Sequence, residues 1–164
     1  MKTGHMIEPL ETAIQTLDSK LDNIDSAENL ILEFAQRAGF RGDELEKVGL
    51  AVREVVANAI IHGNRLDEQK KVVVTALRTP GQLKVAVWDQ GKGFDLDGVA
   101  DPRSPEVLLK ESGRGIYMAR AFMDRFDVEV GSGGGATVSM VKYIPKQRNA
   151  AAQLADTVGQ AVAS

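Results

Sequence analysis

The sequence predicts an α+β fold, a two-layer α/β sandwich in which a mostly antiparallel sheet carries its helices on one face. Two stretches with helical spacing of apolar residues lie next to each other between residues 26 and 63. Four short stretches rich in β-branched and apolar residues follow at 71–77, 83–88, 126–130 and 136–143. Because helices and strands are largely segregated along the chain, the sheet is expected to be mostly antiparallel.

The chain begins with a predicted strand and a predicted helix. Residues 12–21 alternate weakly between apolar and polar side chains, which favours a first strand. Asp25 and Ser26 offer an N-cap for the first helix, and Gly39 is a plausible C-cap.

The second helix is expected to start near Asp43 and to reach Gly63. On a helical wheel its apolar stripe lies nearly opposite Glu54 and Asn58. The stripe consists of Leu45, Val48, Val52, Val55, Val56 and Ala59. Small and apolar side chains flank the Glu–Asn pair, a combination that suits the wall of a pocket better than a solvated surface.

A hairpin and a long loop follow. Pro80 and Gly81 separate the strands predicted at 71–77 and 83–88, and Pro followed by Gly is strong turn chemistry. Residues 95–112 contain three Asp and two Pro residues with little regular pattern. They therefore predict a loop or lid, and loops of this length are often functional.

The last predicted elements are a helix that follows Gly115 and two strands around a glycine-rich turn. With 164 residues, 43% of them apolar and 26% charged, the chain is expected to form one globular domain. That domain is predicted over residues 12–145, after a flexible start at 1–11. The polar, alanine-rich tail at 146–164 is expected to be a frayed helix or disordered.

Composition excludes several classes of function. The net charge is −3, and Lys and Arg are scattered, so direct binding of nucleic acid is not expected. The chain has no cysteine, which excludes disulfides, thiolate metal sites and cysteine nucleophiles and fits a reducing compartment. No apolar stretch is long enough to span a bilayer, and the start lacks a signal-type apolar core. We therefore expect a soluble, cytoplasmic protein with no membrane association.

Glu54 and Asn58 are candidates for metal and proton chemistry. An amide oxygen is a hard ligand that suits Mg²⁺, which takes its further ligands from waters and substrate phosphates. A carboxylate one helical turn away could orient and deprotonate an attacking hydroxyl. An isolated pair of this kind is more often a solvated helix face. His62 follows on the same side, and as a lone histidine it fits packing or hydrogen bonding better than metal ligation.

Asp89 ends a strand that is otherwise apolar. A partly desolvated carboxylate there can accept a hydrogen bond from an exocyclic amine such as that of adenine, and it would disfavour guanine. Gly91 and Gly93 would let the backbone pass close to a flat ring. The alternative is an Asp-Gly turn without a ligand. A calcium loop is disfavoured, because its twelfth position is Ala100.

Gly113-Arg114-Gly115 precedes a predicted helix, where free backbone amides and the helix dipole favour an anion. Arg114 adds a bidentate donor. The glycines at 131–135 loosely imitate the glycine loop of protein kinases, but a hairpin turn explains them, and the other kinase motifs and a P-loop are absent from the sequence. Thr137 could reach a nucleotide from the end of the sheet.

Taken together, these segments resemble the Bergerat-fold (GHKL) ATPases, the superfamily of gyrase, Hsp90, histidine kinases and MutL. Residues 54–64 resemble the N box, residues 89–94 the first glycine box and residues 113–115 the second. The resemblance covers residues 12–145 and is strongest to the stand-alone anti-sigma-factor serine/threonine kinases.

The resemblance implies a role for each of these residues. Asn58 would ligate Mg²⁺, Glu54 would be the general base, and Asp89 would bind the adenine amine. The other expected nucleotide-binding residues are His62, Gly91, Gly93, Lys110, Gly113, Arg114, Gly115 and Thr137. Relatives often carry a basic residue just before the second glycine box, where this chain has Glu111 and Ser112, so Lys110 or Arg114 would have to contact the γ-phosphate.

The resemblance also implies partners. Family members bind a sigma factor, phosphorylate a serine or threonine of a small STAS-domain anti-anti-sigma protein, and are commonly homodimers. We therefore expect an ATP- and Mg²⁺-dependent serine/threonine protein kinase.

Two alternatives remain. A detached histidine-kinase catalytic domain would need a phosphoacceptor histidine, and only His5 and His62 are present. An ATP-gated protein that sequesters a sigma factor or another regulator, with little or no transfer activity, would have no use for a base at Glu54.

Overall fold

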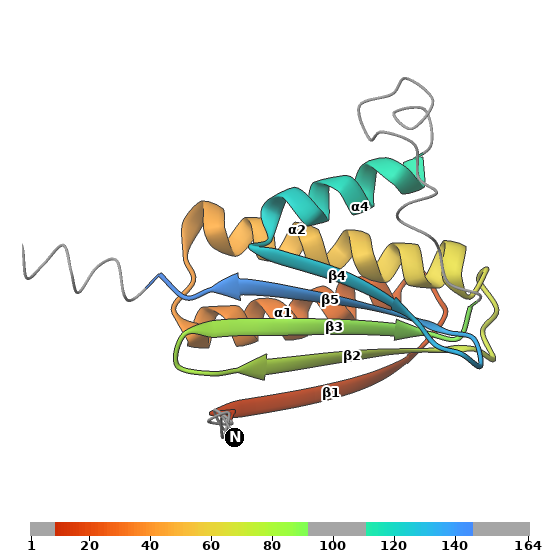
Figure 1. The fold of residues 1–164 in the computed structure, drawn as a ribbon, viewed down its shortest axis with the longest axis horizontal. Helices are drawn as coiled ribbons and strands as arrows, with labels where there is room; N and C mark the ends of the chain where they lie inside the picture. Colours follow the sequence, from red (N-terminus) through yellow and green to blue (C-terminus); the bar gives the residue numbers. More distant parts are fainter. Residues whose placement is uncertain (1–8, 92–110, 146–164) are drawn as a thin grey trace, which may run out of the picture.

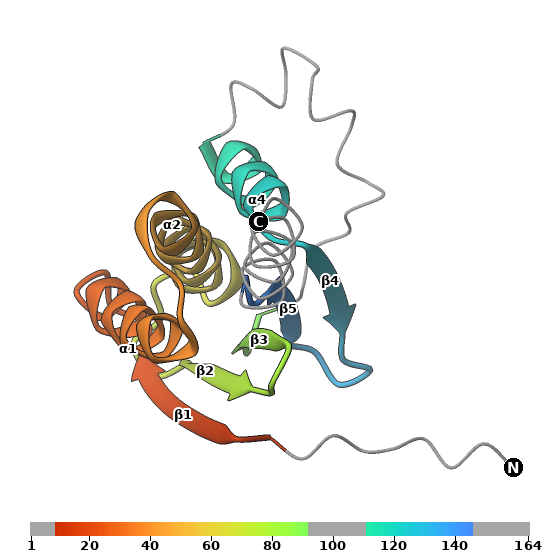
Figure 2. The same cartoon turned by 90° about the vertical axis from the view of Figure 1, so that its left-hand side faces the viewer.

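The computed structural model of the chain describes residues 9–91 and 111–145. In chain order these contain β1 (Glu11–Asp18), α1 (Asn23–Ala38), α2 (Gly42–Asn58), the π-helical turn η1 (Ala59–Gly63), β2 (Lys71–Arg78), β3 (Gln82–Asp89), α4 (Glu111–Phe122), β4 (Arg125–Val130) and β5 (Ala136–Tyr143). The strands form one sheet in the order β1-β2-β3-β5-β4, and every neighbouring pair is antiparallel. Figures 1 and 2 show α1, α2 and α4 side by side on one face of this sheet. The predicted two-layer α+β sandwich is confirmed.

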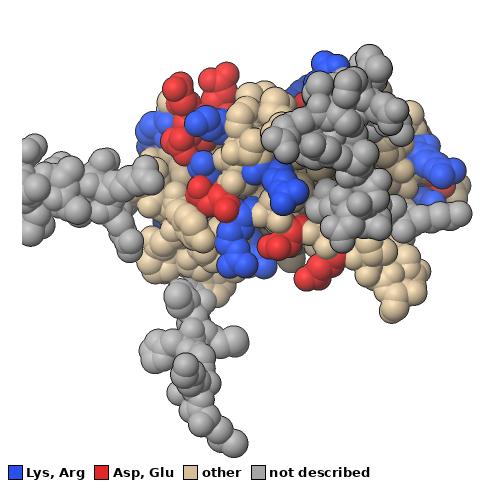
Figure 3. Space-filling model, turned by 45° about the horizontal axis from the view of Figure 1, so that its top comes forward, with Lys and Arg blue, Asp and Glu red and all other residues tan. Residues whose placement is uncertain are grey.

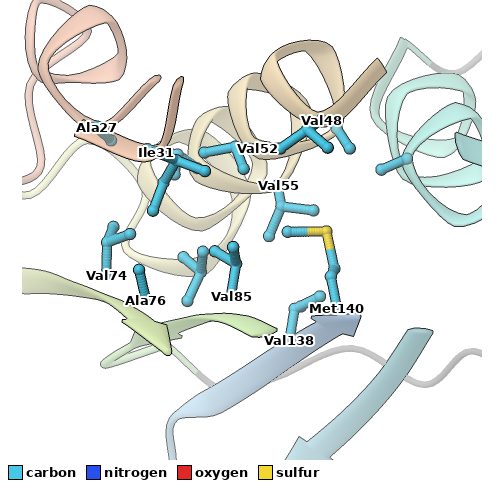
Figure 4. Close-up of a cluster of buried hydrophobic side chains, with 14 of the residues drawn as sticks. Ala27, Ile31, Val48, Val52, Val55, Val74, Ala76, Val85, Val138 and Met140 are labelled. Atoms are coloured by element: carbon cyan, nitrogen blue, oxygen red, sulfur yellow. The ribbon is translucent and has the colours of Figure 1, made fainter. Parts of the chain in front are cut away.

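The hydrophobic core lies between the helices and the sheet. Figure 4 shows side chains of α1 and α2 meeting those of β2, β3 and β5. Ile31, Val52, Val85 and Met140 are completely buried there. Strand residues alternate between the two faces, so every second residue of β3 is buried under the helices, ending with Asp89. The core therefore fixes α2 over the middle of the sheet, next to the end of β3.

Two predicted boundaries near the N-terminus are wrong. β1 ends at Asp18, which pairs with Lys71, the first residue of β2, so the strand stops where its partner begins. α1 begins at Asn23 and not after Asp25. Asp25 lies in the first helical turn, where its charge suits the helix dipole, and it pairs with Arg53 of α2 at 2.6 Å.

Three other local predictions are confirmed. Gly39 caps α1 in the left-handed region, with φ of 105°. The hairpin joins β2 to β3 through residues 79–81. α2 and η1 together run from residue 42 to residue 63, as the apolar stripe predicts.

Acidic and basic side chains are interspersed on the surface. On the face drawn in Figure 3, neither sign forms a continuous patch over the residues that are coloured. Within residues 9–91 and 111–145, no helix combines the length and the apolar character needed to cross a membrane.

Candidate functional site

One helix carries the first pair of candidate residues. Glu54 and Asn58 stand one turn apart on α2, and both are partly exposed. Val55 and Val56 beside them are buried in the core, so the apolar stripe anchors the helix and leaves the polar pair at its margin. This arrangement agrees with the predicted separation of the two faces.

The end of this helix reaches the end of β3. Its last turn, η1, is π-helical, and the N–H of Asn64 donates to the carbonyl of Ala59 at 2.8 Å. A Cβ built on Gly63 would lie 2.6 Å from Cγ of Asp89, and a Cβ built on Gly91 would lie 2.2 Å from the carbonyl oxygen of Gly63. Only glycine fits at such separations, so the end of η1 and the glycine segment after β3 are in direct backbone contact.

Asp89 is the buried acid of the site, with 4% of its surface exposed. Burial raises the pKa of its carboxyl group. Backbone N–H groups of Gly91 and Ala136 and the charge of Lys70 lower that pKa and so offset part of the effect. The Gly91 N–H donates to Oδ1 at 2.8 Å. A carboxylate removed from water in this way gains from accepting a further hydrogen bond, such as one from an amine of a bound ligand.

The hairpin between β4 and β5 closes the site on one side. Gly135 has φ of +84°, and a Cβ built on it would lie 2.8 Å from the carbonyl oxygen of Asp89. Its N–H donates to the carbonyl of Gly91 at 2.6 Å. Glycines at 63, 91 and 135 therefore let three backbone segments pack closely around Asp89, where a side chain at any of these positions would overlap its neighbours.

The structure does not bring Thr137 to the same face as Asp89. In the β3–β5 pairing, Asp89 is opposite Ala136, and Thr137 is opposite Trp88. Residues directly opposite each other in an antiparallel pair share a face, so Thr137 lies on the face without helices. The position of β5 on the side of Asp89 is Ala136.

The second glycine segment lies inside a helix, which corrects the prediction that the helix follows Gly115. α4 begins at Glu111, so of the three residues only Gly113 lies among the first-turn positions whose amides lack a helical partner. The glycine at 115 instead allows close packing, because a Cβ there would lie 2.0 Å from Oε2 of Glu54. The second glycine segment therefore meets α2 at the candidate base.

The remaining candidates are less closely placed. His62 lies in η1 and Arg114 in α4, and both are exposed. Gly93, Lys110 and most of the predicted lid lie outside the described residues. Sequence reasoning assigned no role to Asn64, which is completely buried. Its burial depends on segments that are distant in the sequence, and only its place directly after Gly63 could have drawn attention to it.

Comparison with known proteins gives a consistent result. A family model described as a histidine kinase-like ATPase domain matches residues 17–142. The serine-protein kinase RsbW of Bacillus licheniformis is 33% identical over 120 residues, which are 70% of this chain and 74% of that protein. RsbW of Bacillus subtilis strain 168 shows the same identity and coverage.

Solved structures agree on the fold. A crystal structure of the RsbU and RsbW domains of a Mycobacterium tuberculosis protein superposes with a TM-score of 0.60 at 21% identity, over 82% of this chain and 32% of that one. The catalytic domain of the histidine kinase ThkA superposes with a TM-score of 0.51 at 15% identity, over 80% of this chain and 98% of that one.

Proposed function

The chain belongs to the family of histidine kinase-like ATPase domains, and from this membership we propose that it is an ATP-dependent serine/threonine protein kinase acting as an anti-sigma factor. One observation carries the proposal. A single helix, α2 with η1, meets the first glycine segment through Gly63 and the second through Glu54. Three segments that are far apart in the sequence thus meet along this one helix, between the buried Asp89 and the candidate base Glu54.

We infer that the described residues would bind an adenine nucleotide. The glycines at 63, 91 and 135 allow the end of η1, the segment after β3 and the β4–β5 hairpin to pack closely around Asp89, and Asp89 would accept the hydrogen bond of the adenine amine. Asn58 lies five residues before Gly63, about 8 Å along the helix at 1.5 Å per residue. From there its amide oxygen would bind Mg²⁺ together with phosphate oxygens and water.

The phosphoryl transfer step would take place at Glu54, where α2 meets α4. Bound Mg²⁺ would neutralise charge on the phosphates. Glu54 would orient the attacking hydroxyl of the protein substrate and take up its proton. The first turn of α4, which contains Gly113, would present backbone amides to the phosphates, with Arg114 or Lys110 as the charged partner. The absence of a side chain at Gly115 leaves room for the Glu54 carboxylate.

The proposed substrate is a serine or threonine of a STAS-domain anti-anti-sigma protein, and the proposed binding partner is a sigma factor. The relatives are named serine-protein kinases, which supports a protein serine as the phosphate acceptor. A protein that acts on a sigma factor would work in the cytoplasm, so we propose a cytoplasmic location, and we propose a homodimer, as is common in the family.

A transfer assay tests the proposal. The protein is incubated with γ-labelled ATP, Mg²⁺ and STAS proteins from the same source. Glu54→Gln should abolish labelling yet retain ATP binding, because the amide keeps the shape of the side chain but cannot accept the proton. Glu46→Gln, at an exposed position of the same helix, is the matched control and should label as the unmodified protein does.

Undiminished labelling by Glu54→Gln would contradict the base assignment. ATP binding without a labelled STAS protein, together with ATP-dependent retention of a sigma factor, would instead support the ATP-gated binding protein.

A further inference from the structure

The segment that follows η1 has an unusual backbone. Arg65 and Leu66 have φ of 54° and 59°, a region that side chains other than Gly, Asn and Asp rarely adopt. The N–H of Leu66 donates to the carbonyl of Ile60 at 2.9 Å, so the chain wraps back over the π-helical turn. Two consecutive residues of this kind persist only where the surrounding structure holds them in place.

The side chain of Asn64 supplies that hold. It is completely buried. Its Nδ2 donates to Oγ of Ser19 at 2.8 Å and to the carbonyl of Lys71 at 2.9 Å. Its Oδ1 accepts the N–H of Gln90 at 2.8 Å. The three partners lie just after β1, at the start of β2 and just after β3, so one amide joins three strand ends to the end of the helix.

Asn64 is also linked to the two segments that lie next to the Asp89 carboxylate. Gly63, which precedes Asn64, packs its backbone against that carboxylate. Gln90, which follows Asp89, gives its N–H to Asn64, and its Oε1 accepts the N–H of Lys71 at 2.6 Å. A shift of Asn64 would therefore displace Asp89 both from the helix side and along its own chain.

We propose that Asn64 is a positioning residue for adenine recognition, whose three hydrogen bonds hold the Asp89 carboxylate in the orientation that accepts the exocyclic amine. The inference rests on the proposed function, and it assigns Asn64 no contact with the nucleotide. It requires a selective effect. Replacing Asn64 should weaken the binding of a purine nucleotide that carries the 6-amino group much more than the binding of one that lacks it. A residue that only stabilises the fold would affect both nucleotides alike.

The test compares two nucleotides on matched variants. ATP and purine riboside triphosphate, in which hydrogen replaces the 6-amino group, are titrated calorimetrically into folded protein, with folding checked by urea unfolding. We expect Asn64→Ala to weaken the binding of ATP about 10-fold, which corresponds to about 1.4 kcal/mol. The binding of the other nucleotide should weaken less than about 2-fold. Asp89→Asn should show the same selectivity. Asn29→Ala, at an exposed position of α1, should change neither affinity.

The two variants together distinguish failure of the positioning role from failure of the adenine assignment. If Asp89→Asn is selective and Asn64→Ala weakens both nucleotides equally, or neither, the positioning role is overturned and the proposed function stands. If Asp89→Asn itself is not selective, the adenine assignment fails, and the inference fails with it.

Should Asn64→Ala not fold, Ser19→Ala removes one of the three partners and leaves the other two. That variant should weaken the binding of ATP about 3-fold, or by about 0.6 kcal/mol, and leave the binding of purine riboside triphosphate unchanged. An unselective effect in Ser19→Ala would equally overturn the role.

Discussion

The backbone contact between Gly91 and Gly63 can be tested by adding a single methyl group. A Cβ on Gly91 would lie 2.2 Å from the carbonyl oxygen of Gly63, 2.6 Å from its carbonyl carbon and 2.8 Å from its Cα. All three are backbone atoms, so no side-chain rotation relieves the overlap. The two segments must separate by roughly 0.8 Å to restore even a 3.0 Å contact.

The cost of this separation follows from what it disturbs. Overpacking of a well-packed interior costs about 1–3 kcal/mol. The movement also strains the bond from the Gly91 N–H to Asp89 and the bond from the Gly135 N–H to the Gly91 carbonyl, and losing one such bond costs about 1 kcal/mol. We expect Gly91→Ala to lower the free energy of unfolding by about 3 kcal/mol and to weaken ATP binding as Asp89 shifts.

Urea unfolding followed by the fluorescence of Trp88, the only tryptophan of the chain, measures the effect. Gly81→Ala is the matched control, because a Cβ there meets nothing within 4 Å. That variant should be neutral, or more stable by up to about 1 kcal/mol, since alanine restricts the unfolded chain. An unchanged midpoint and m-value for Gly91→Ala would refute the reasoning.

Three further predictions follow from named contacts. Gly115→Ala should preserve or slightly raise stability, because alanine favours a helix by up to about 1 kcal/mol. Its methyl group displaces the Glu54 carboxylate, so labelling of the protein substrate should fall about 100-fold or more. Asp89→Asn should raise the free energy of unfolding at pH 7 and weaken ATP binding. Burial raises the pKa of Asp89, so the destabilisation caused by burying its ionised carboxylate is fully present above that pKa and disappears as the pH falls below the pKa of the unfolded chain. In urea unfolding from pH 4 to 8, the stabilities of the two proteins should therefore converge in acid. Over the same range, calorimetry should show that ATP affinity of the unmodified protein falls as Asp89 is protonated. Lys142→Met should lower stability by about 1–2 kcal/mol in urea unfolding, because Nζ of Lys142 donates to the carbonyl of Phe122 at 2.9 Å.

The fold was predictable because its elements carry local patterns. The apolar stripe of α2 recurs at helical spacing, and the structure buries most of it, including Val48, Val52 and Val55. Pro80 and Gly81 specify the hairpin through backbone preferences that need no partner. These features depend on residues a few positions apart, so the sequence alone indicates them.

The site was less predictable, because its geometry depends on contacts between distant segments. The position of Gly115 within α4 depends on α2, since a glycine that usually interrupts a helix is favoured where another element must come close. The face of Thr137 depends on its register with β3, and a shift of one residue reverses the face of every side chain. Asn64 acquires its partners only when three strand ends meet.

The two ends of the site are built differently, and this difference separates stability from activity. Around Asp89, backbone segments pack closely against one another and against the buried carboxylate, so substitutions at 63, 91 or 135 disturb the fold itself. At Glu54 the contact is between a flexible carboxylate and α4, which packs on α2 and is tied to β5 at its other end through Lys142. A shift of α4 along α2 would change the surroundings of Glu54 without moving Asp89. Nucleotide affinity and phosphoryl transfer are therefore expected to respond to different substitutions.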